Sequence, residues 1–318
     1  MSHDSDNIRG RVLSIQSHVV SGYVGNKAAV FPLQLLGFEV DIINSVHFSN
    51  HTGYPQSFEG DVMNGEQLRR LISGLERNNL LQETRHVLTG YIGSATFLRE
   101  VLRIVTKLKS RIPALRYVCD PVLGDNDKLY VPQELVQVYR DEIIPNADIV
   151  TPNQFEVEQL TGILIENIGD AKLACCCLHN MGPEIVIITS LEGLEGNNNG
   201  RIMTILASRR NKCDQGDEIW KIEFPVIKGR YTGTGDLCAA LFLAWTSPDN
   251  VENNKTFLSQ SLEKVVATMQ CVIQRTCDAS EGSVTEESRS SVAARELKLI
   301  ASKVDIEQPP VKYKAFKV

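Results

Sequence analysis

The stretch GRYTGTGDLCAALFLAW, residues 229–245, places a glycine-rich turn directly before a long apolar segment. Gly233 and Gly235 flank Thr234, and Asp236 stands at the head of the apolar run. Glycines cost backbone entropy, and a carboxylate beside an apolar helix needs a favourable partner. The backbone N–H groups of such a turn converge at the positive end of a helix, which favours an anion site. The simpler alternative is that Asp236 only caps the helix.

Several well-known motifs do not fit the sequence. No Gly-Lys-Ser/Thr follows the glycines, as it would in a Walker A loop, and their spacing and late position differ from the dinucleotide-binding fingerprint. The chain has no G-x-S-x-G and no H-E-x-x-H. Serine hydrolase and zinc protease functions therefore have no support.

The chain before the glycine turn alternates short β-branched runs with amphipathic segments. The runs expected as strands cover residues 11–15, 40–46, 86–91, 116–121, 147–151 and 184–190. Helical periodicity is clearest at residues 66–78 and 95–110. Nearly continuous apolar strands that alternate with helices indicate an α/β fold, with a mostly parallel sheet between two helical layers. Ligands of such sheets bind at the carboxyl ends of the strands.

The later part of the chain has a different pattern. Residues 201–208 and 218–226 are expected to be antiparallel strands at one edge of the sheet. Helices are expected at 236–246, 259–277 and 290–303. One domain over 11–305 is the simplest organisation, with a disordered leader at 1–10 and a C-terminal tail at 306–318.

Composition restricts the function classes. The chain has 318 residues, 42% of them apolar, and a formal charge of −6, which disfavours nucleic-acid binding. It has no transmembrane run of about 18 apolar residues and no apolar signal segment near its N-terminus. The eight cysteines include no CxxC pair, which favours a reducing cytoplasm. Cys175 and His179 share a helix face, but buried apolar cysteines are a better interpretation than a metal site.

Two polar clusters follow expected strands. In CDPVLGD (119–125), Asp120 and Asp125 suit a hard cation such as Mg²⁺, held partly through water, although turn formation would also explain them. In TPNQFEVEQL (151–160), Asn153 and Glu156 form either a helix capping box or part of a cluster around a metal-bound phosphate chain.

Two further segments lie near the start of the chain. SIQSH (14–18) ends the first strand with two hydroxyl side chains, and VHFSNHTGY (46–54) is polar and aromatic after an apolar strand. The histidines of the second segment, His47 and His51, are more often hydrogen-bonded loop residues than catalysts.

Together these motifs resemble the ribokinase-like superfamily of small-molecule kinases. The segment 11–54, with VLTGYIGS (87–94), YVCDPVLGD (117–125), TPNQFE (151–156) and GTGD (233–236), is similar to the eukaryotic type of the pyridoxal kinase family. The resemblance covers roughly residues 10–305. It implies a three-layer α/β/α sandwich and ATP-dependent phosphorylation of the 5′-hydroxyl of pyridoxal, pyridoxine or pyridoxamine.

The resemblance also implies roles for single residues. Asp236 matches the base that takes the proton of the accepting hydroxyl, and Gly233, Thr234 and Gly235 match the anion hole. The matching substrate-binding residues are Ser17, Val46, Phe48, Thr52, Tyr91, Gly235 and Asp236. The matching ATP-binding residues are Asp120, Tyr130, Asn153, Gln154, Phe155, Glu156, Thr189, Ser190, Ile227, Lys228, Gly229 and Thr234.

Ions and partners follow from the same resemblance. Asp125 matches the residue beside Mg²⁺, or another divalent ion such as Zn²⁺, and Asp120, Thr151 and Thr189 match positions near a monovalent cation, K⁺ or Na⁺. A cytoplasmic homodimer that binds no nucleic acid and no membrane is implied.

The chain departs from the family pattern at three places. Gly93 stands where some animal members carry Arg, Thr232 replaces an apolar residue, and the segment 125–130 is shorter than in mammalian members. Two alternatives to a pyridoxal kinase stay open: a hydroxymethylpyrimidine or sugar kinase, and a B6-binding carrier or regulator without turnover. The segment 48–54 disfavours a sugar, and the intact carboxylates disfavour a carrier.

Overall fold

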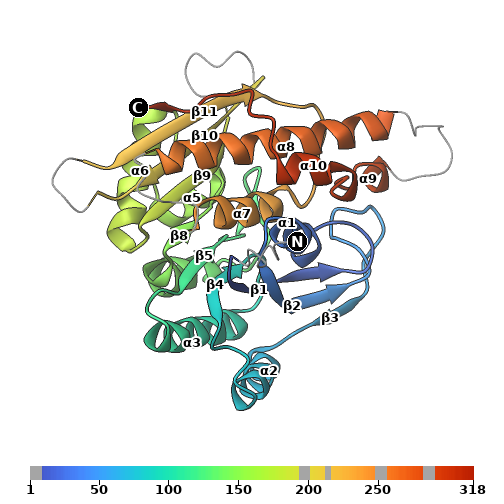
Figure 1. Ribbon diagram of the computed structural model, residues 1–318, viewed down its shortest axis with the longest axis vertical. Helices are drawn as coiled ribbons and strands as arrows, with labels where there is room; N and C mark the ends of the chain where they lie inside the picture. The colour runs from blue at the N-terminus through green and yellow to red at the C-terminus, as the bar shows by residue number, and fades with distance from the viewer. Residues whose placement is uncertain (1–8, 193–200, 212–215, 248–255, 282–290) are drawn as a thin grey trace, which may run out of the picture.

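The computed structural model describes residues 9–192, 201–211, 216–247, 256–281 and 291–318. Its main sheet has the order β12-β11-β10-β9-β8-β5-β4-β1-β2-β3 (Figure 1). The strands are β1 (Arg11–Val19), β2 (Glu39–Phe48), β3 (Gly60–Val62), β4 (Thr84–Thr89), β5 (Arg116–Cys119), β8 (Ile149–Val150), β9 (Ile185–Leu191), β10 (Ile202–Arg209), β11 (Glu218–Pro225) and β12 (Phe316–Lys317).

The centre of the sheet is parallel and its edges are antiparallel. The six expected strands before the late hairpin form the parallel part, from β2 through β1, β4, β5 and β8 to β9. Strands β10 and β11 continue it as the expected antiparallel pair, and β12 pairs with β11. The short β3, which was not expected, pairs antiparallel with β2 at the opposite edge.

Strand alternation explains why the parallel strands are apolar throughout. In β1, Val12 belongs to the core on one face of the sheet, whereas Leu13 and Ile15 belong to the core on the other. Val87 and Leu88 of β4 divide in the same way. Both faces of these strands are therefore covered, as parallel sheets require.

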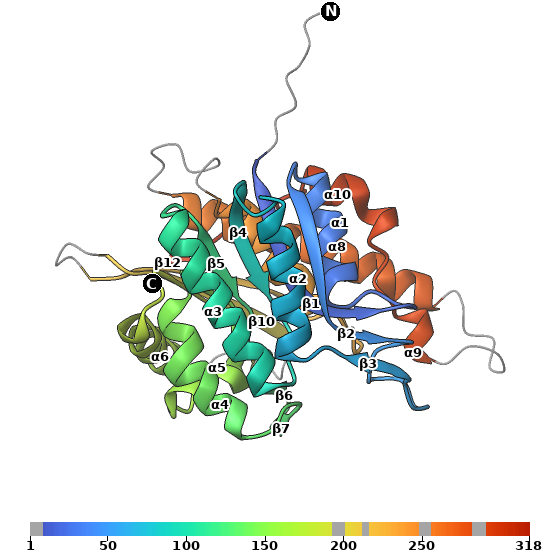
Figure 2. The same cartoon turned by 90° about the horizontal axis from the view of Figure 1, so that it is seen from below.

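The helices form one layer on each face, which completes the three-layer sandwich (Figures 1 and 2). One layer contains α2 (Gly65–Arg77), α3 (Ala95–Arg111), α4 (Glu134–Val138), α5 (Gln154–Thr161) and α6 (Ile168–Met181), with a π-helical turn (Tyr139–Ile143) and a 3-10 turn (Ile144–Asn146). The other contains α1 (Asn26–Leu35), α7 (Thr234–Trp245), α8 (Phe257–Glu281) and α10 (Lys303–Glu307). Among the described residues, none of these helices is both long and apolar enough to cross a membrane.

The helix expected over residues 290–303 was wrong. The segment instead forms α9 (Ser291–Ala294), an irregular stretch, a 3-10 turn (Ile300–Ser302) and the start of α10. Leu297 and Leu299 are both fully buried. Residues two apart lie on different faces of a helix. The chain therefore leaves the helix to bury both leucines, and Glu296 turns toward the N-terminal loops.

The two ends of the chain were expected to lie outside the domain. Residues 1–8 of the leader lie outside the described residues, and Arg9 N–H donates to Gly37 O at 2.9 Å. At the other end, Ile306 is buried, and Phe316 pairs with Lys221 in β11. The segment 306–318 therefore extends the sheet by one edge strand.

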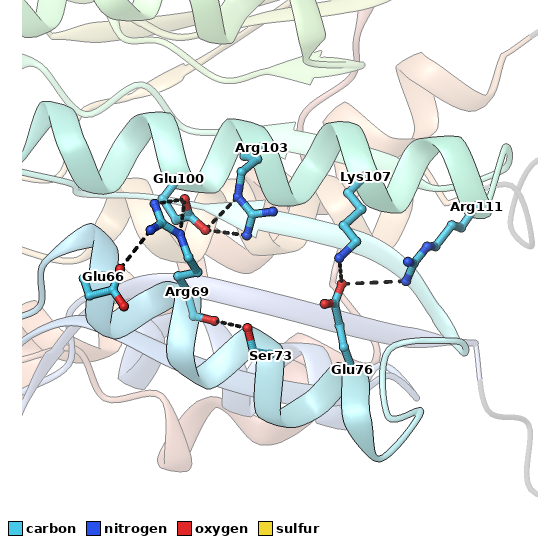
Figure 3. A network of polar contacts seen from close by, with 8 residues as sticks. All are labelled: Glu66, Arg69, Ser73, Glu76, Glu100, Arg103, Lys107 and Arg111. Atoms are coloured by element: carbon cyan, nitrogen blue, oxygen red, sulfur yellow. Dashed lines mark hydrogen bonds and ion pairs between the residues drawn. The ribbon is translucent and has the colours of Figure 1, made fainter.

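A carboxylate joins α2 to α3 on the outside of one layer (Figure 3). Glu100 of α3 accepts hydrogen bonds from Arg103 Nη2 at 2.6 Å and from Arg69 Nη2 of α2 at 3.1 Å. Burial favours the neutral acid, but the two guanidinium groups outweigh it and lower the pKa of Glu100. A second contact joins Lys107 Nζ to Glu76 Oε1 at 2.5 Å. These ion pairs hold α2 against α3.

Candidate active site

The residues singled out in the sequence gather where the parallel strands end and α7 begins. Ser17 lies near the C-terminal end of β1, Val46 and Phe48 lie at the end of β2, and Tyr91 follows β4. Asp120 follows β5, and Thr151 follows β8. This is the edge at which open parallel sheets bind ligands.

Gly233 begins α7 in a conformation that only glycine accepts there. Its φ is 87°, and a Cβ built on it would lie 2.0 Å from Tyr23 O. Gly233, at the N-cap, has no side chain with which to cap this helix, and the Asp236 carboxylate accepts from its own backbone N–H in the first turn. Asp236 Oδ2 also accepts a hydrogen bond from Gly25 N–H at 2.8 Å, a contact outside the helix that capping alone does not explain. Thr234 and Gly235 precede Asp236 in the first turn of α7.

Burial raises the pKa of Asp236, and the N–H of Gly25 opposes part of that shift. Gly25 has a φ of 54°, and a Cβ there would lie 2.0 Å from Ser17 O and 2.4 Å from Ser17 Oγ. Ser17 and Asp236 therefore lie on either side of one glycine. Ser17 also lies opposite a β-bulge in β2: Gln16 pairs with Asn44, whereas His18 pairs with His47, so β2 has one extra residue there.

An apolar wall lies beside Ser17. Val46, Phe48 and Tyr91 pack in one small cluster, as the resemblance implied, together with Val19 and Val24, which the sequence analysis did not single out. The Phe48 ring also contacts Phe58, with the ring centroids 4.5 Å apart. Tyr91 is half-buried, so part of the wall is open to a ligand.

Thr52 is exposed on the loop between β2 and β3, next to the buried His51. His51 Nδ1 accepts from Gly53 N–H at 3.1 Å, and His51 Nε2 lies 3.2 Å from Glu296 Oε1. Two of the departures from the family pattern lie close by. A Cβ on Gly53 would lie 3.7 Å from Thr232 Oγ1, and a Cβ on Gly93 would lie 2.9 Å from the Tyr91 hydroxyl oxygen.

Three carboxylates meet on the other side of the glycine turn. A Cβ on Gly235 would lie 3.7 Å from Asp120 Oδ2, and Thr151 Oγ1 donates to Asp120 Oδ1 at 3.3 Å. Burial raises the pKa of Asp120, and the charges of Glu156 and Asp236 raise it further. Burial also raises the pKa of Glu156, against the hydrogen bonds it accepts. This mutual repulsion would be relieved by a cation.

Glu156 forms the capping box that is the simpler interpretation of its motif, and it makes a further contact outside its helix. Asn153 and Glu156 form the capping box of α5, with Asn153 Oδ1 accepting from Glu156 N–H at 2.8 Å. Glu156 Oε1 also accepts from Leu123 N–H at 2.9 Å, which joins α5 to the loop after β5. The neighbouring Gln154 Oε1 accepts from Glu192 N–H at 3.2 Å just after β9.

The short segment 125–130 is a tight hairpin. Strands β6 (Gly124–Asp125) and β7 (Lys128–Leu129) are joined by Asn126 and Asp127, which have φ values of 49° and 56°. Positive φ at both turn residues is the type I′ geometry that suits a two-residue hairpin. Asp125 is exposed, and its carboxylate accepts from the Asn126 N–H at 2.9 Å. A Cβ on Gly124 would lie 2.7 Å from the Phe155 ring.

The other residues matched to nucleotide binding border this hairpin and the end of β9. Tyr130 is 45% exposed beyond β7. Thr189 N–H donates to Pro152 O at 3.0 Å, and Ser190 follows it, half-buried. Ile227 is half-buried and Lys228 and Gly229 are exposed on the segment that leads to Gly233.

The oxygen atoms of these side chains suit a cation most of whose ligands are water molecules and phosphate groups. In the described part of the chain, no group of three or more His, Cys, Asp or Glu residues could hold a metal ion by itself. Mg²⁺ is usually bound by one or two carboxylates together with substrate phosphates. Asp125 and the buried Asp120 and Glu156 fit that pattern, and the hydroxyls of Thr151 and Thr189 add oxygen atoms nearby.

The pairing of Cys175 with His179 does not form a metal site. His179 Nδ1 lies 2.8 Å from Pro183 O, and Nε2 lies 2.8 Å from Ser208 Oγ, so both ring nitrogens already have partners. Burial raises the pKa of Cys175, which keeps the thiol protonated.

Catalysis of phosphoryl transfer depends mainly on positioning the reactants and on hydrogen-bond donors that stabilise the charge on the transferred group. The glycine turn at the start of α7, the Asp236 carboxylate beside it and the apolar wall of Val46, Phe48 and Tyr91 supply these features for a small acceptor. The class of protein that this fold and site define is a small-molecule kinase of the ribokinase-like type.

Comparison with known proteins identifies the family. The family model for phosphomethylpyrimidine kinase matches residues 81–273. Pyridoxal kinase from Arabidopsis thaliana is 50% identical over 308 residues, which cover 96% of this chain and 94% of that protein. The Homo sapiens pyridoxal kinase is 44% identical over 312 residues, or 95% and 96% of the two chains. The chain belongs to the pyridoxal kinase family.

A solved structure agrees with this assignment. Pyridoxal kinase from Leishmania donovani in complex with ADP and pyridoxamine matches with a TM-score of 0.85 and 32% sequence identity, over 97% of this chain and 99% of that one. The expected three-layer fold is therefore confirmed by both the topology and a relative.

Proposed function

We propose that this protein transfers the γ-phosphoryl group of ATP to the 5′-hydroxyl of pyridoxal, with pyridoxine and pyridoxamine as further acceptors, in vitamin B6 salvage. The observation that carries the proposal is the geometry of Asp236: its carboxylate is held by Gly25 N–H at 2.8 Å, at the head of a helix whose N-cap residue, Gly233, has no side chain. Relatives named pyridoxal kinase over nearly the full chain support the choice of substrate.

The acceptor binds between Ser17 and the apolar wall. Val46, Phe48 and Tyr91 hold the pyridine ring, and Ser17 and Thr52 hydrogen-bond its substituents. Asp236 accepts the proton of the 5′-hydroxyl as the bond to phosphorus forms. Its raised pKa, caused by burial, suits a group that must take a proton and release it later. The N–H groups of Gly233, Thr234 and Gly235 stabilise the charge on the transferred phosphoryl group.

The nucleotide lies over the other half of the edge, along α5, the β6–β7 hairpin and residues 227–229. Asp125 holds the divalent cation together with Asp120 and Glu156 near the phosphates, and Asp120, Thr151 and Thr189 hold the monovalent cation. A bound cation neutralises phosphate charge and relieves the repulsion among the carboxylates. A cytoplasmic homodimer is part of the proposal, supported by the resemblance.

A hydroxymethylpyrimidine kinase is the second candidate, because the matching family model carries the name phosphomethylpyrimidine kinase. A B6 carrier without turnover is the third. Direct assays separate the three: purified protein is given Mg-ATP and K⁺ with pyridoxal, hydroxymethylpyrimidine or ribose, and phosphorylated product is measured.

The decisive variant is Asp236→Asn, with Asp170→Asn as its matched control. Both aspartates are the third residue of a helix and follow a glycine, but Asp170 belongs to the capping box of α6. We expect pyridoxal phosphorylation by the wild type, a fall in kcat of about 100-fold or more in Asp236→Asn, and unchanged turnover in Asp170→Asn. Pyridoxal binding without any product in the wild type would instead establish the carrier.

A further inference from the structure

Glu296 joins two loops of the acceptor site that are distant in sequence. Its Oε2 accepts from Tyr23 N–H at 2.8 Å, in the loop between β1 and α1. Its Oε1 accepts from the Tyr54 hydroxyl at 2.9 Å and lies 3.2 Å from His51 Nε2, in the loop between β2 and β3. The Glu296 side chain is 12% exposed. One carboxylate therefore makes three contacts to two separate loops.

Each of these loops carries a residue of the proposed site. Thr52 lies between His51 and Gly53, and the His51 ring spans it: Nδ1 accepts from Gly53 N–H at 3.1 Å, so Nε2 carries the proton that faces Glu296. On the other loop, two residues beyond Tyr23, Gly25 N–H holds Asp236 Oδ2 at 2.8 Å.

The local backbone is shaped around the carboxylate. Gly22 has a φ of 102°, and a Cβ on it would lie 2.5 Å from Glu296 Oε1, so a side chain cannot be accommodated there without moving Glu296. Tyr23 O in turn lies against Gly233, at the start of α7. The exit of the chain from α9 places Glu296 at this point rather than along a continuous helix.

A buried carboxylate is an expensive way to fasten a surface loop if stability is the only purpose. Ionised groups lose hydration on burial, and apolar contacts would hold the loops at lower cost. What the carboxylate adds is direction, because each oxygen accepts hydrogen bonds only from donors at defined positions. The three donors fix the distance between the loop of Thr52 and the loop of Gly25.

We propose that Glu296 is a positioning residue of the acceptor site, which holds residues 51–54 against residues 22–25 so that Thr52 and Asp236 face one bound substrate. The inference rests on the proposed kinase function. Residues 291–307 include none of the proposed site residues. The inference gives this segment the role of fixing the distance between the two acceptor loops.

The test compares Glu296→Gln with the wild type and with Glu263→Gln. Glu263 is a matched control, because its side chain is 15% exposed and also accepts a backbone N–H, from Ala315 at 3.1 Å, far from the acceptor loops. Tyr54→Phe, which removes one donor and keeps the ring, is the second variant. Steady-state constants for pyridoxal and for ATP, pyridoxal binding without ATP, and the melting temperature are measured for each.

We expect Glu296→Gln to raise KM and Kd for pyridoxal about 10-fold, with KM for ATP unchanged within a factor of about two. Tyr54→Phe should change the pyridoxal constants in the same direction by about 3-fold, and Glu263→Gln should leave them unchanged. Amide exchange at residues 50–58 should accelerate in Glu296→Gln and not in the control.

Other outcomes overturn the inference. Pyridoxal constants that are unchanged in both Glu296→Gln and Tyr54→Phe would contradict it, and so would equal losses for pyridoxal and ATP that follow a lowered melting temperature. If Glu296→Gln does not fold, Tyr54→Phe decides by itself. A wild type without pyridoxal turnover would contradict the proposed function instead, and the binding measurements would still test the loop geometry.

Discussion

At the scale of single residues, the site depends on glycines whose conformation is set by close approach. Gly233 brings the start of α7 against Tyr23 O, and Gly25 brings its N–H onto Asp236 and against Ser17 O. Both have positive φ, and at both positions a Cβ would lie 2.0 Å from a carbonyl oxygen. The base and the anion hole are therefore joined through backbone rather than through side chains.

A substitution of Gly233 tests this view. Gly233→Ala forces the turn away from Tyr23 O, so we expect kcat to fall about 100-fold, because the N–H groups of α7 no longer point at the transferred phosphoryl group. Gly162→Ala is the control: Gly162 also has positive φ, 75°, but nothing lies within 4 Å of its Cβ position. The control should lose about 1 kcal/mol of stability and keep its kcat. Steady-state assays and denaturant unfolding measure both, and equal kcat values in the two variants would contradict the prediction.

The residues that could be predicted from the sequence are those that belong to short contiguous motifs. The two carboxylate motifs and the aromatic segment at the end of β2 come together because each follows a parallel strand, and GTGD reaches the same edge after the antiparallel strand β11. Glu296 was missed because its signal is not local: it lies in an ordinary helical pattern, and its partners are more than 240 residues earlier. Val19 and Val24 were missed because isolated valines resemble any other core residue.

At the scale of elements, strands were easier to locate than the last helices. A strand buried on both faces has a continuous apolar run, whereas the pattern at 290–303 fits a helix locally and fails only because Leu297 and Leu299 both enter the core. Tertiary packing overrides the local preference there. The edge strands β3 and β12 are short, at Gly60–Val62 and Phe316–Lys317, and have too few residues for an alternation to be visible.

The contact between α2 and α3 provides a prediction at this scale. Glu100→Gln removes the carboxylate that Arg69 and Arg103 share between α2 and α3. Arg69 then keeps only Glu66 of its own helix, and we expect a loss of about 1 kcal/mol in the free energy of unfolding. Glu66→Gln is the control, because the Glu66 side chain is 64% exposed and its contact with Arg69 lies within one helix. Chemical denaturation measures both variants, whose contacts are drawn in Figure 3. Kinetic constants should not change, because Glu66 and Glu100 lie in α2 and α3, which contain none of the proposed site residues. A control as destabilising as Glu100→Gln would show that the link between the helices contributes nothing.

At the scale of the whole molecule, the carboxyl ends of the parallel strands carry the proposed binding site, whereas their amino ends contribute to the stability of the fold. The carboxyl ends hold buried carboxylates that repel one another, which is unfavourable for the fold and useful for binding cations. Near the amino end of β4, His86 is buried among Phe38 and neighbouring groups, with Ser247 Oγ 3.5 Å from its Nε2. Its task is structural, and it makes the stability of the entire fold depend on pH.

The direction of this dependence follows from the pKa of His86. Burial, together with the charges of Arg116 and Arg85, lowers the pKa of His86 from 6.5 to about 4. Between these values the unfolded chain binds a proton at His86 and the folded chain does not. Stability is therefore fully present above pH 6.5 and is lost as the pH falls toward 4.

His86→Gln removes that proton-binding group and should flatten the acid limb of the stability curve. The expected difference is about 2 kcal/mol between pH 7 and pH 5, present in the wild type and absent from the variant. Urea unfolding at intervals of half a pH unit gives both curves, and a comparison at pH 8 isolates any packing cost, because His86 is neutral there in both states. Parallel curves below pH 6.5 would mean that His86 takes up its proton equally in the folded and unfolded chains, and the acid sensitivity of the fold would then have to originate in other groups.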